Sequence, residues 1–120
     1  MNTQTTAAMQ LVNCTPHPLN IHLAGTGDIL TLAPSGTLPR LAVTREPRPA
    51  LTLPDGVAVA VVRPTLGAMT GLPDAVPGVV LIVSALVADA ARRADVMSPG
   101  ELVRDSAGVI TGCRGLCSYA

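Results

Sequence analysis

The stretch that constrains the fold most spans residues 79–94 and reads VVLIVSALVADAARRA. Residues 79–83 are continuously apolar and mostly β-branched, which is typical of a strand covered on both faces. The residues that follow favour a helix, because Ser84 can serve as its N-cap and helix formers continue to Ala94. The stretch therefore predicts a central strand that leads directly into the one convincing α-helix of the chain, from about Ser84 to Ala94.

Short strand patterns with turn residues between them occupy most of the remaining chain. Leu19, Ile21 and Leu23 alternate with polar residues, residues 24–28 read as a turn, and residues 29–32 as the return strand. Residues 101–105 and 109–112 read as a closing hairpin. Residues 45–54 carry three prolines and predict a surface loop. We therefore expect an α+β, β-rich fold with a mostly antiparallel sheet of short strands and one helix.

Length and composition set the domain count and the assembly state that we expect. The 120 residues fit a flexible N-terminus over residues 1–10 and a single β-rich domain over residues 11–120. With neither Phe nor Trp, the core must be built from Val, Leu, Ile and Ala. Only 13% of the residues are charged, which is too few to cover a small domain, so we expect a homo-oligomer that buries apolar surface between copies.

Charge and cysteine usage exclude several classes of partner. The formal net charge is zero and no basic stripe is present, which disfavours duplex nucleic acid and anionic membranes. No apolar run approaches the roughly 20 residues that cross a bilayer. Three cysteines, an odd number with no signal peptide before them, favour a cytoplasmic location. The spacing of Cys113 and Cys117 matches no standard zinc finger, so we expect no metal and no cofactor.

The segment Asn13-x-Thr15-Pro16-His17 concentrates an amide, a hydroxyl and an imidazole within a few residues. Such a cluster could hold a ligand or orient a water molecule. Alternatively, the Asn and Thr side chains bond to the backbone of a turn and leave His17 half exposed. His22 alternates with core positions and is interpreted as a solvent-facing strand residue.

Three further positions could bind an anion. Ser84 stands at a strand-to-helix junction, where free N–H groups favour phosphate or carboxylate. The preferred interpretation is a plain N-cap, which nearly every helix needs. Arg114 lies between Gly112 and Gly115, which permit close backbone approach, and could hold a phosphate. Arg104 lies on the predicted last hairpin. The alternative is that both arginines are surface charges beside a turn.

An enzymatic function would need Cys113 as a nucleophile and an imidazole beside it. Only the fold could bring His17 there, and the chain has neither a nucleophile elbow nor a glycine-rich phosphate loop. We therefore assign no catalytic residue.

Several motifs together resemble a known group of proteins. They are LVNCTPHPLNI (11–21), PSG (34–36), IVSALVA (82–88), RAD (93–95), PGELVRD (99–105) and GCRGL (112–116). In this order they are similar to a group of small uncharacterised proteins of phages, prophages and bacteria, and the resemblance covers residues 11–116. The chain departs from that pattern with Cys14 in place of Leu and with Leu81 where an aromatic residue is common.

The resemblance implies a binding role, because small phage proteins are often inhibitors, ligand-sequestering sponges or assembly factors. Our leading hypothesis is a non-enzymatic protein that binds a small molecule or partner, such as a phage-type sponge that sequesters a nucleotide-derived signal in the host cytoplasm. The two alternatives are a structural or assembly oligomer without a ligand, and a small hydrolase that uses Cys113 and His17. The predicted ligand-binding residues are Asn13, Thr15, His17, Ser84, Arg104 and Arg114.

Overall fold

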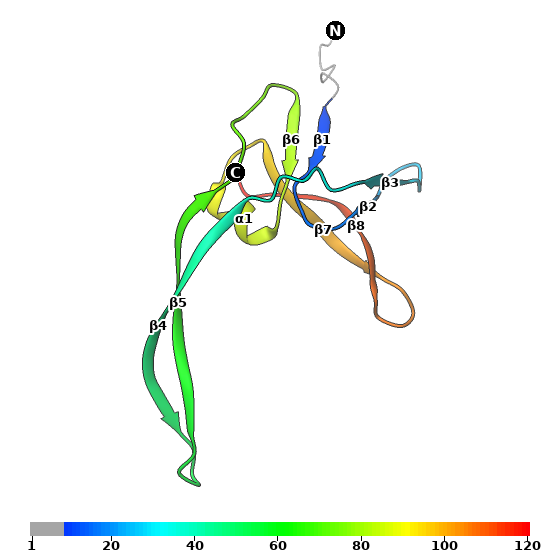
Figure 1. Ribbon diagram of the computed structural model, residues 1–120. Helices are drawn as coiled ribbons and strands as arrows, with labels where there is room; N and C mark the ends of the chain where they lie inside the picture. The colour runs from blue at the N-terminus through cyan, green and yellow to red at the C-terminus, as the bar shows by residue number, and fades with distance from the viewer. Residues whose placement is uncertain (1–8) are drawn as a thin grey trace.

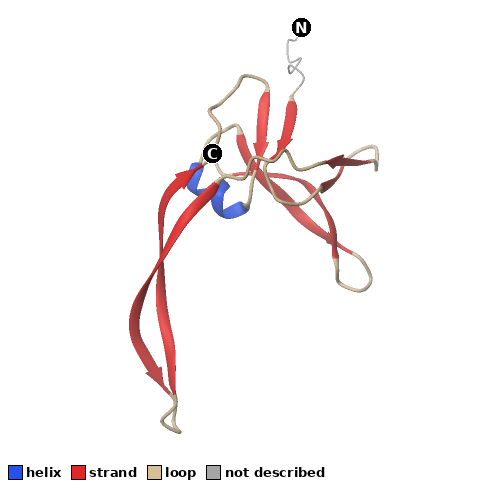
Figure 2. Cartoon of the chain, in the orientation of Figure 1, coloured by secondary structure: helices blue, strands red, loops and turns tan. Residues whose placement is uncertain are grey.

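The computed structural model describes residues 9–120, which form a curled six-stranded sheet, one helix and a separate two-stranded arm (Figures 1 and 2). The six-stranded sheet has the order β1-β6-β7-β8-β2-β3. Its strands are β1 (Gln10–Asn13), β2 (Leu19–His22), β3 (Ile29–Leu32), β6 (Val79–Ile82), β7 (Val96–Arg104) and β8 (Ile110–Ser118). The predicted flexible N-terminus spans residues 1–10, of which residues 1–8 lie outside the described part of the chain. Gln10 begins β1 and pairs with Val79.

The sheet is mixed. β1 pairs with β6, β6 with β7, and β2 with β8 in parallel, whereas β7–β8 and β2–β3 are antiparallel hairpins. The β-rich fold with one helix is confirmed, but the expectation of a mostly antiparallel sheet is wrong. The two hairpins have local turn signals in the sequence. The parallel pairs β1–β6 and β2–β8 join segments far apart in the chain, for which no local pattern exists. The parallel pair β6–β7 is closer in sequence and is connected through the one helix.

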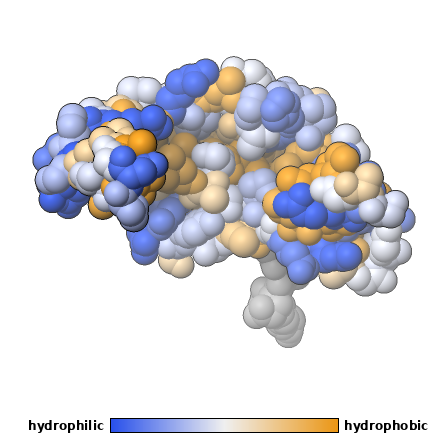
Figure 3. Space-filling view, turned by 90° about the horizontal axis from the view of Figure 1, so that it is seen from below, coloured by the Kyte–Doolittle hydropathy of each residue, from blue (hydrophilic) through white to orange (hydrophobic). Residues whose placement is uncertain are grey.

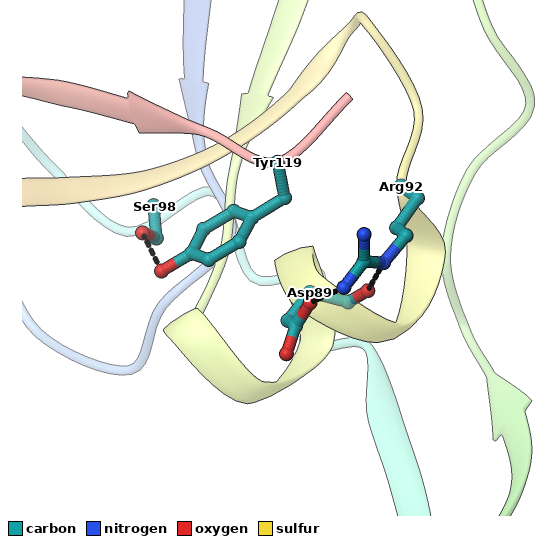
Figure 4. Close-up of polar contacts among 4 residues, drawn as sticks. All are labelled: Asp89, Arg92, Ser98 and Tyr119. Carbon is teal, nitrogen blue, oxygen red and sulfur yellow. Dashed lines mark hydrogen bonds and ion pairs between the residues drawn. The ribbon is translucent and has the colours of Figure 1, made fainter.

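The helix α1 (Ala85–Ala91) supplies the crossover between the parallel strands β6 and β7. Ser84 caps it, since the Ser84 Oγ accepts a hydrogen bond from the Val87 N–H at 3.3 Å. The helix ends before the predicted Ala94 because Arg92 adopts a left-handed conformation, with φ 48°. The Arg92 side chain folds back onto Asp89, as Figure 4 shows, and forms an ion pair of 2.7 Å.

One face of the sheet packs against α1. Val83, Val96 and Ala88 are fully buried in this cluster. Tyr119, the one aromatic residue of the chain, packs against the same cluster and points its hydroxyl at Ser98, at 3.4 Å (Figure 4). The sheet thereby obtains a covered core without Phe or Trp.

The opposite face curls around a second cluster. Ile82, Ile21 and Cys113 are its buried members, and leucines of β2, β3 and β8 pack around them. The curl brings the edge strands β1 and β3 close together at one end, where the Ser35 N–H donates to the Asn13 carbonyl at 2.8 Å. A six-stranded sheet therefore encloses its own apolar interior.

The two remaining strands, β4 (Arg40–Thr52) and β5 (Ala58–Thr70), form an antiparallel hairpin that extends away from the sheet and α1 (Figure 1). We call this hairpin the arm, and the other described residues the body. The predicted loop over residues 45–54 is wrong, because most of it belongs to β4. Both strands of a two-stranded sheet are edge strands, so proline is tolerated where its nitrogen faces outward. Pro47 accordingly lies opposite Val62 within the ladder.

Candidate functional site

Asn13 ties the N-terminal turn to the body. Its Nδ2 donates to the carbonyl oxygens of His17, at 2.9 Å, and Leu32, at 3.0 Å. Its Oδ1 accepts from the backbone N–H and the hydroxyl of Thr15, at 2.9 and 2.6 Å. An amide offers two donor hydrogens and two acceptor lone pairs, so these four bonds use its full capacity. Asn13 and Thr15 therefore shape the turn that presents His17.

His17 is exposed at the mouth of a pocket of about 370 Å³, which we call the His17 pocket. Its walls come mainly from β2, β7 and β8 and combine leucine, isoleucine and proline with a few polar groups. The lining residues are His17, Pro18, Leu19, Asn20, Pro99, Leu102, Ile110, Thr111, Gly112 and Cys113. The Asn20 side chain is already bonded to Thr111 and Thr31, which leaves the imidazole as the available polar group.

The fold brings Cys113 and His17 to the same pocket, as the hydrolase hypothesis requires. Cys113, however, is only 1% exposed, and its thiol donates to the Gly115 carbonyl at 3.6 Å. No hydrogen bond joins the two side chains among residues 9–120. A nucleophilic cysteine is an accessible thiolate beside a base, so this arrangement favours a structural thiol over a reactive one.

A second pocket, of about 380 Å³, borders the same pair of strands farther along. We call it the Arg114 pocket, and its lining residues are Ile21, His22, Leu23, Ala24, Arg114 and Gly115. Arg114 and His22 are register partners across the parallel pair β2–β8. Directly paired residues project to the same side of a sheet, so the guanidinium and the imidazole both line this pocket.

The backbones of β2 and β8 approach each other closely at Gly112, next to this pair. A Cβ at Gly112 would lie 2.6 Å from the Asn20 carbonyl oxygen and 3.1 Å from the His22 Nε2. A side chain at Gly112 would therefore push His22 away and separate β2 from β8. Glycine at this position leaves room for the His22 imidazole, whose Nε2 lies over Gly112.

The Arg114 guanidinium is only loosely engaged by protein groups. Its nearest acid is Glu101 on β7, with Nε and Oε1 3.6 Å apart and both side chains more than half exposed. That separation is too long for a hydrogen bond. The hydrogen bonds among the described residues include none from the Arg114 side chain, so its donors remain available to an anion.

Ser84 and Arg104 lie elsewhere. Ser84 Oγ is used as the helix cap and borders a smaller pocket of about 230 Å³ near Arg40. Arg104 donates to the Gly108 carbonyl at 3.0 Å, within the turn between β7 and β8. Of the predicted positions, Asn13, Thr15 and His17 thus lie together, and Ser84 borders the same small pocket as Thr15. Arg104 and Arg114 are separate from them.

Sequence reasoning missed His22 as a partner of Arg114. The alternation over residues 19–23 places His22 on the outer face, but no local signal says that β2 pairs with β8. The one usable hint was the pair of glycines flanking Cys113 and Arg114, which indicated close backbone approach.

The described residues contain no group of three or more His, Cys, Asp or Glu side chains that could hold a metal ion. Across residues 9–120, no helix combines the length and apolar character needed to cross a membrane. The chain matches no family model, no curated protein and no solved structure.

Proposed function

We propose that this chain is a non-enzymatic binding protein for a small anionic molecule, and that the Arg114 pocket holds the anionic group. The observation that carries the proposal is the register pairing of His22 with Arg114 at the wall of a pocket of about 380 Å³. A nucleotide-derived signal is the ligand class that fits best, because such molecules combine phosphate with a body of matching size.

The chemistry of the pocket supports recognition of phosphate or carboxylate. A guanidinium presents planar, paired donors that match the oxygens of either group, and a neighbouring imidazole adds a further donor. The apolar walls, from Ile21, Leu23 and Ala24, offer aliphatic contacts to the rest of the ligand. Recognition of a base would rest on these contacts and on hydrogen bonds, since no Phe, Tyr or Trp lines the pocket.

Glu101 acts in this proposal as a weak internal competitor. At 3.6 Å it neutralises part of the Arg114 charge in the free protein, and an incoming phosphate replaces it with shorter, bidentate bonds. An exposed ion pair of this kind contributes little to stability, so its replacement costs little.

Binding is favoured over the hydrolase alternative by the burial of the Cys113 thiol. A protein that binds a small molecule without converting it would sequester that molecule, which is the role we propose, as in phage sponge proteins. This role rests additionally on the motif resemblance.

Isothermal titration of the full chain with ADP-ribose, cyclic AMP and inorganic phosphate tests the proposal. Arg114→Gln should weaken binding at least tenfold, since a charge-assisted hydrogen bond contributes about 1.5–3 kcal/mol. Glu101→Gln should leave binding intact or tighten it, because it removes the competitor. Arg63→Gln on the arm removes the same charge outside both pockets and serves as the control.

Two results would reject the proposal. One is the absence of binding to every compound in the panel. The other is binding that survives Arg114→Gln but is lost in His17→Ala, which would move the ligand to the His17 pocket.

A further inference from the structure

The arm lacks a core of its own. Among its residues only Leu41, Val61 and Met69 are even partly buried, and Leu41 and Met69 pack at its base against the body. Farther out, Val43, Val62 and Leu66 remain 42–50% exposed. A lone two-stranded hairpin is at best marginally stable in water, so the arm needs a surface to pack on.

The two faces of the arm differ in polarity. Cross-strand pairs alternate between faces along an antiparallel ladder. Between the two irregularities of the ladder, from Val43 to Arg48, the pairs on one face are Val43–Leu66, Arg45–Pro64 and Pro47–Val62, and those on the other are Thr44–Thr65, Glu46–Arg63 and Arg48–Val61. We call the first the apolar face of the arm. It combines exposed apolar side chains with a single charge, which is the pattern of a strand face that is covered.

The body of the same chain does not cover this face. The arm projects from the body, and the chain measures 69 Å along its longest axis with a radius of gyration of 19.0 Å (Figure 1). A compact chain of this length has a radius of gyration of about 14 Å. Seen from below, hydrophobic residues reach the surface on the arm, on the β7–β8 hairpin and between these two hairpins (Figure 3).

Charge separates the arm from the rest of the chain. Residues 40–70 contain four arginines and two acidic residues, a net charge of +2. The remaining residues contain four arginines and six acidic residues, a net charge of −2. The arm of one copy is therefore electrostatically complementary to the body of another, whereas two arms repel each other.

From these observations we propose that the apolar face of the arm packs against the body of a second copy of this chain. The contact buries the exposed valines and leucine and sets the basic arm on the acidic body. The proposal stands on the arm alone and is independent of any ligand in the Arg114 pocket.

Native mass spectrometry and sedimentation of the full chain test this contact with a matched pair of variants. Leu66→Lys places a charge on the apolar face, and Thr65→Lys places the same charge on the neighbouring, polar face. Both variants make the arm more basic, so they differ only in the face that is changed. We expect Leu66→Lys to weaken association at least tenfold and Thr65→Lys to change it less than threefold.

Val62→Lys should repeat the effect of Leu66→Lys, and the far-UV circular dichroism of all three variants establishes that the body is folded. Because opposite charges meet, association of the wild-type chain should also weaken as salt is raised. The proposal is overturned by a wild-type chain that stays monomeric at about 100 μM, well above the range of specific association. It is equally overturned if Leu66→Lys and Thr65→Lys associate alike, or if association strengthens with salt.

Discussion

The body and the arm are built from the same kinds of residue, but the body buries its apolar side chains whereas the arm leaves most of them exposed. The body buries Ile82, Val83 and Val96 completely, although four of its six strands have only four residues and it has no Phe or Trp. The arm has the two longest strands of the chain and leaves Val62 and Leu66 half exposed. The two regions differ in how their strands are connected. In the body, parallel pairing joins distant strands into one six-stranded sheet that buries side chains on both faces, whereas the two strands of the arm pair only with each other. Composition alone therefore does not say which region is self-sufficient.

The largest effect that this comparison predicts is in the body, at Gly100. A Cβ there would lie 2.2 Å from the Arg114 carbonyl oxygen and 2.8 Å from that of Gly115. Backbone cannot yield as a flexible side chain can, so Gly100→Ala must force β7 away from β8. We expect a loss of at least about 3 kcal/mol in the free energy of unfolding, measured by urea denaturation. A loss below about 1 kcal/mol would mean that the β7–β8 pairing is not as tight as described.

The next effect concerns the closure of the curled sheet by Asn13. Asn13→Ala removes the Asn13 donor from the Leu32 carbonyl and leaves the His17 carbonyl with only the Thr15 hydroxyl, at 3.1 Å. It should cost about 2 kcal/mol. Asn20→Ala removes an exposed amide that also makes two bonds, and it should cost less than about 1 kcal/mol. Equal losses in urea denaturation of the two variants would show that Asn13 does not close the sheet.

A smaller, pH-dependent effect on the free energy of unfolding is expected at the ion pair that holds the loop before β6. Arg93 pairs with Asp95 at 2.6 Å and also donates to the Pro73 carbonyl. The hydrogen bond from Arg93 lowers the pKa of Asp95 below its usual range, although partial burial opposes the shift. A lowered carboxyl pKa stabilises the fold above the unfolded-state value of about 3.9, and this contribution is lost as the pH falls through the folded-state value.

Asp95→Asn should therefore cost at most about 1 kcal/mol at pH 7, and this cost should shrink as the pH falls below about 3.9. Thermal unfolding of both proteins across that range measures the difference. A penalty that stays constant down to pH 2 would contradict the ionic origin of this contribution.

The smallest effect is expected in the arm. Val62→Ala removes half-exposed apolar surface, so for a dilute monomer it should change the free energy of unfolding by less than about 0.5 kcal/mol. Ile82→Ala in the body should cost about 2–5 kcal/mol under the same conditions. If urea denaturation of the dilute protein gave similar losses in the free energy of unfolding for the two variants, the distinction between arm and body would be wrong.

Local sequence signals predict the parts of the fold that form locally. The hairpins β2–β3 and β7–β8 and the start of α1 at Ser84 follow from alternation, turn residues and capping. The early end of α1 does not, because Arg92 gives no sign that it adopts a left-handed conformation. The part of β4 from residue 45 onward is missed because prolines argue against a strand. Only the absence of a further neighbouring strand explains why they are tolerated.

The candidate site divides in the same way. Arg114 is predicted from its flanking glycines, but its partner His22 lies 92 positions earlier in the chain and is brought beside it by a parallel pairing. The segment containing Asn13, Thr15 and His17 does form one cluster, as its spacing predicts. The sequence does not say whether these side chains bind a ligand or shape a turn. The hydrogen bonds of Asn13 and Thr15 lie within the turn, so these two residues shape it.

Hydrogen exchange of the full-length chain at two protein concentrations tests the contrast between body and arm most directly. If a second copy covers the arm, the amides of β4 and β5 exchange more slowly at the higher concentration, whereas those of β6 and β7 are protected equally at both. Arm amides that exchange at one rate at both concentrations, in samples whose sedimentation shows a change from monomer to assembly, would contradict the account.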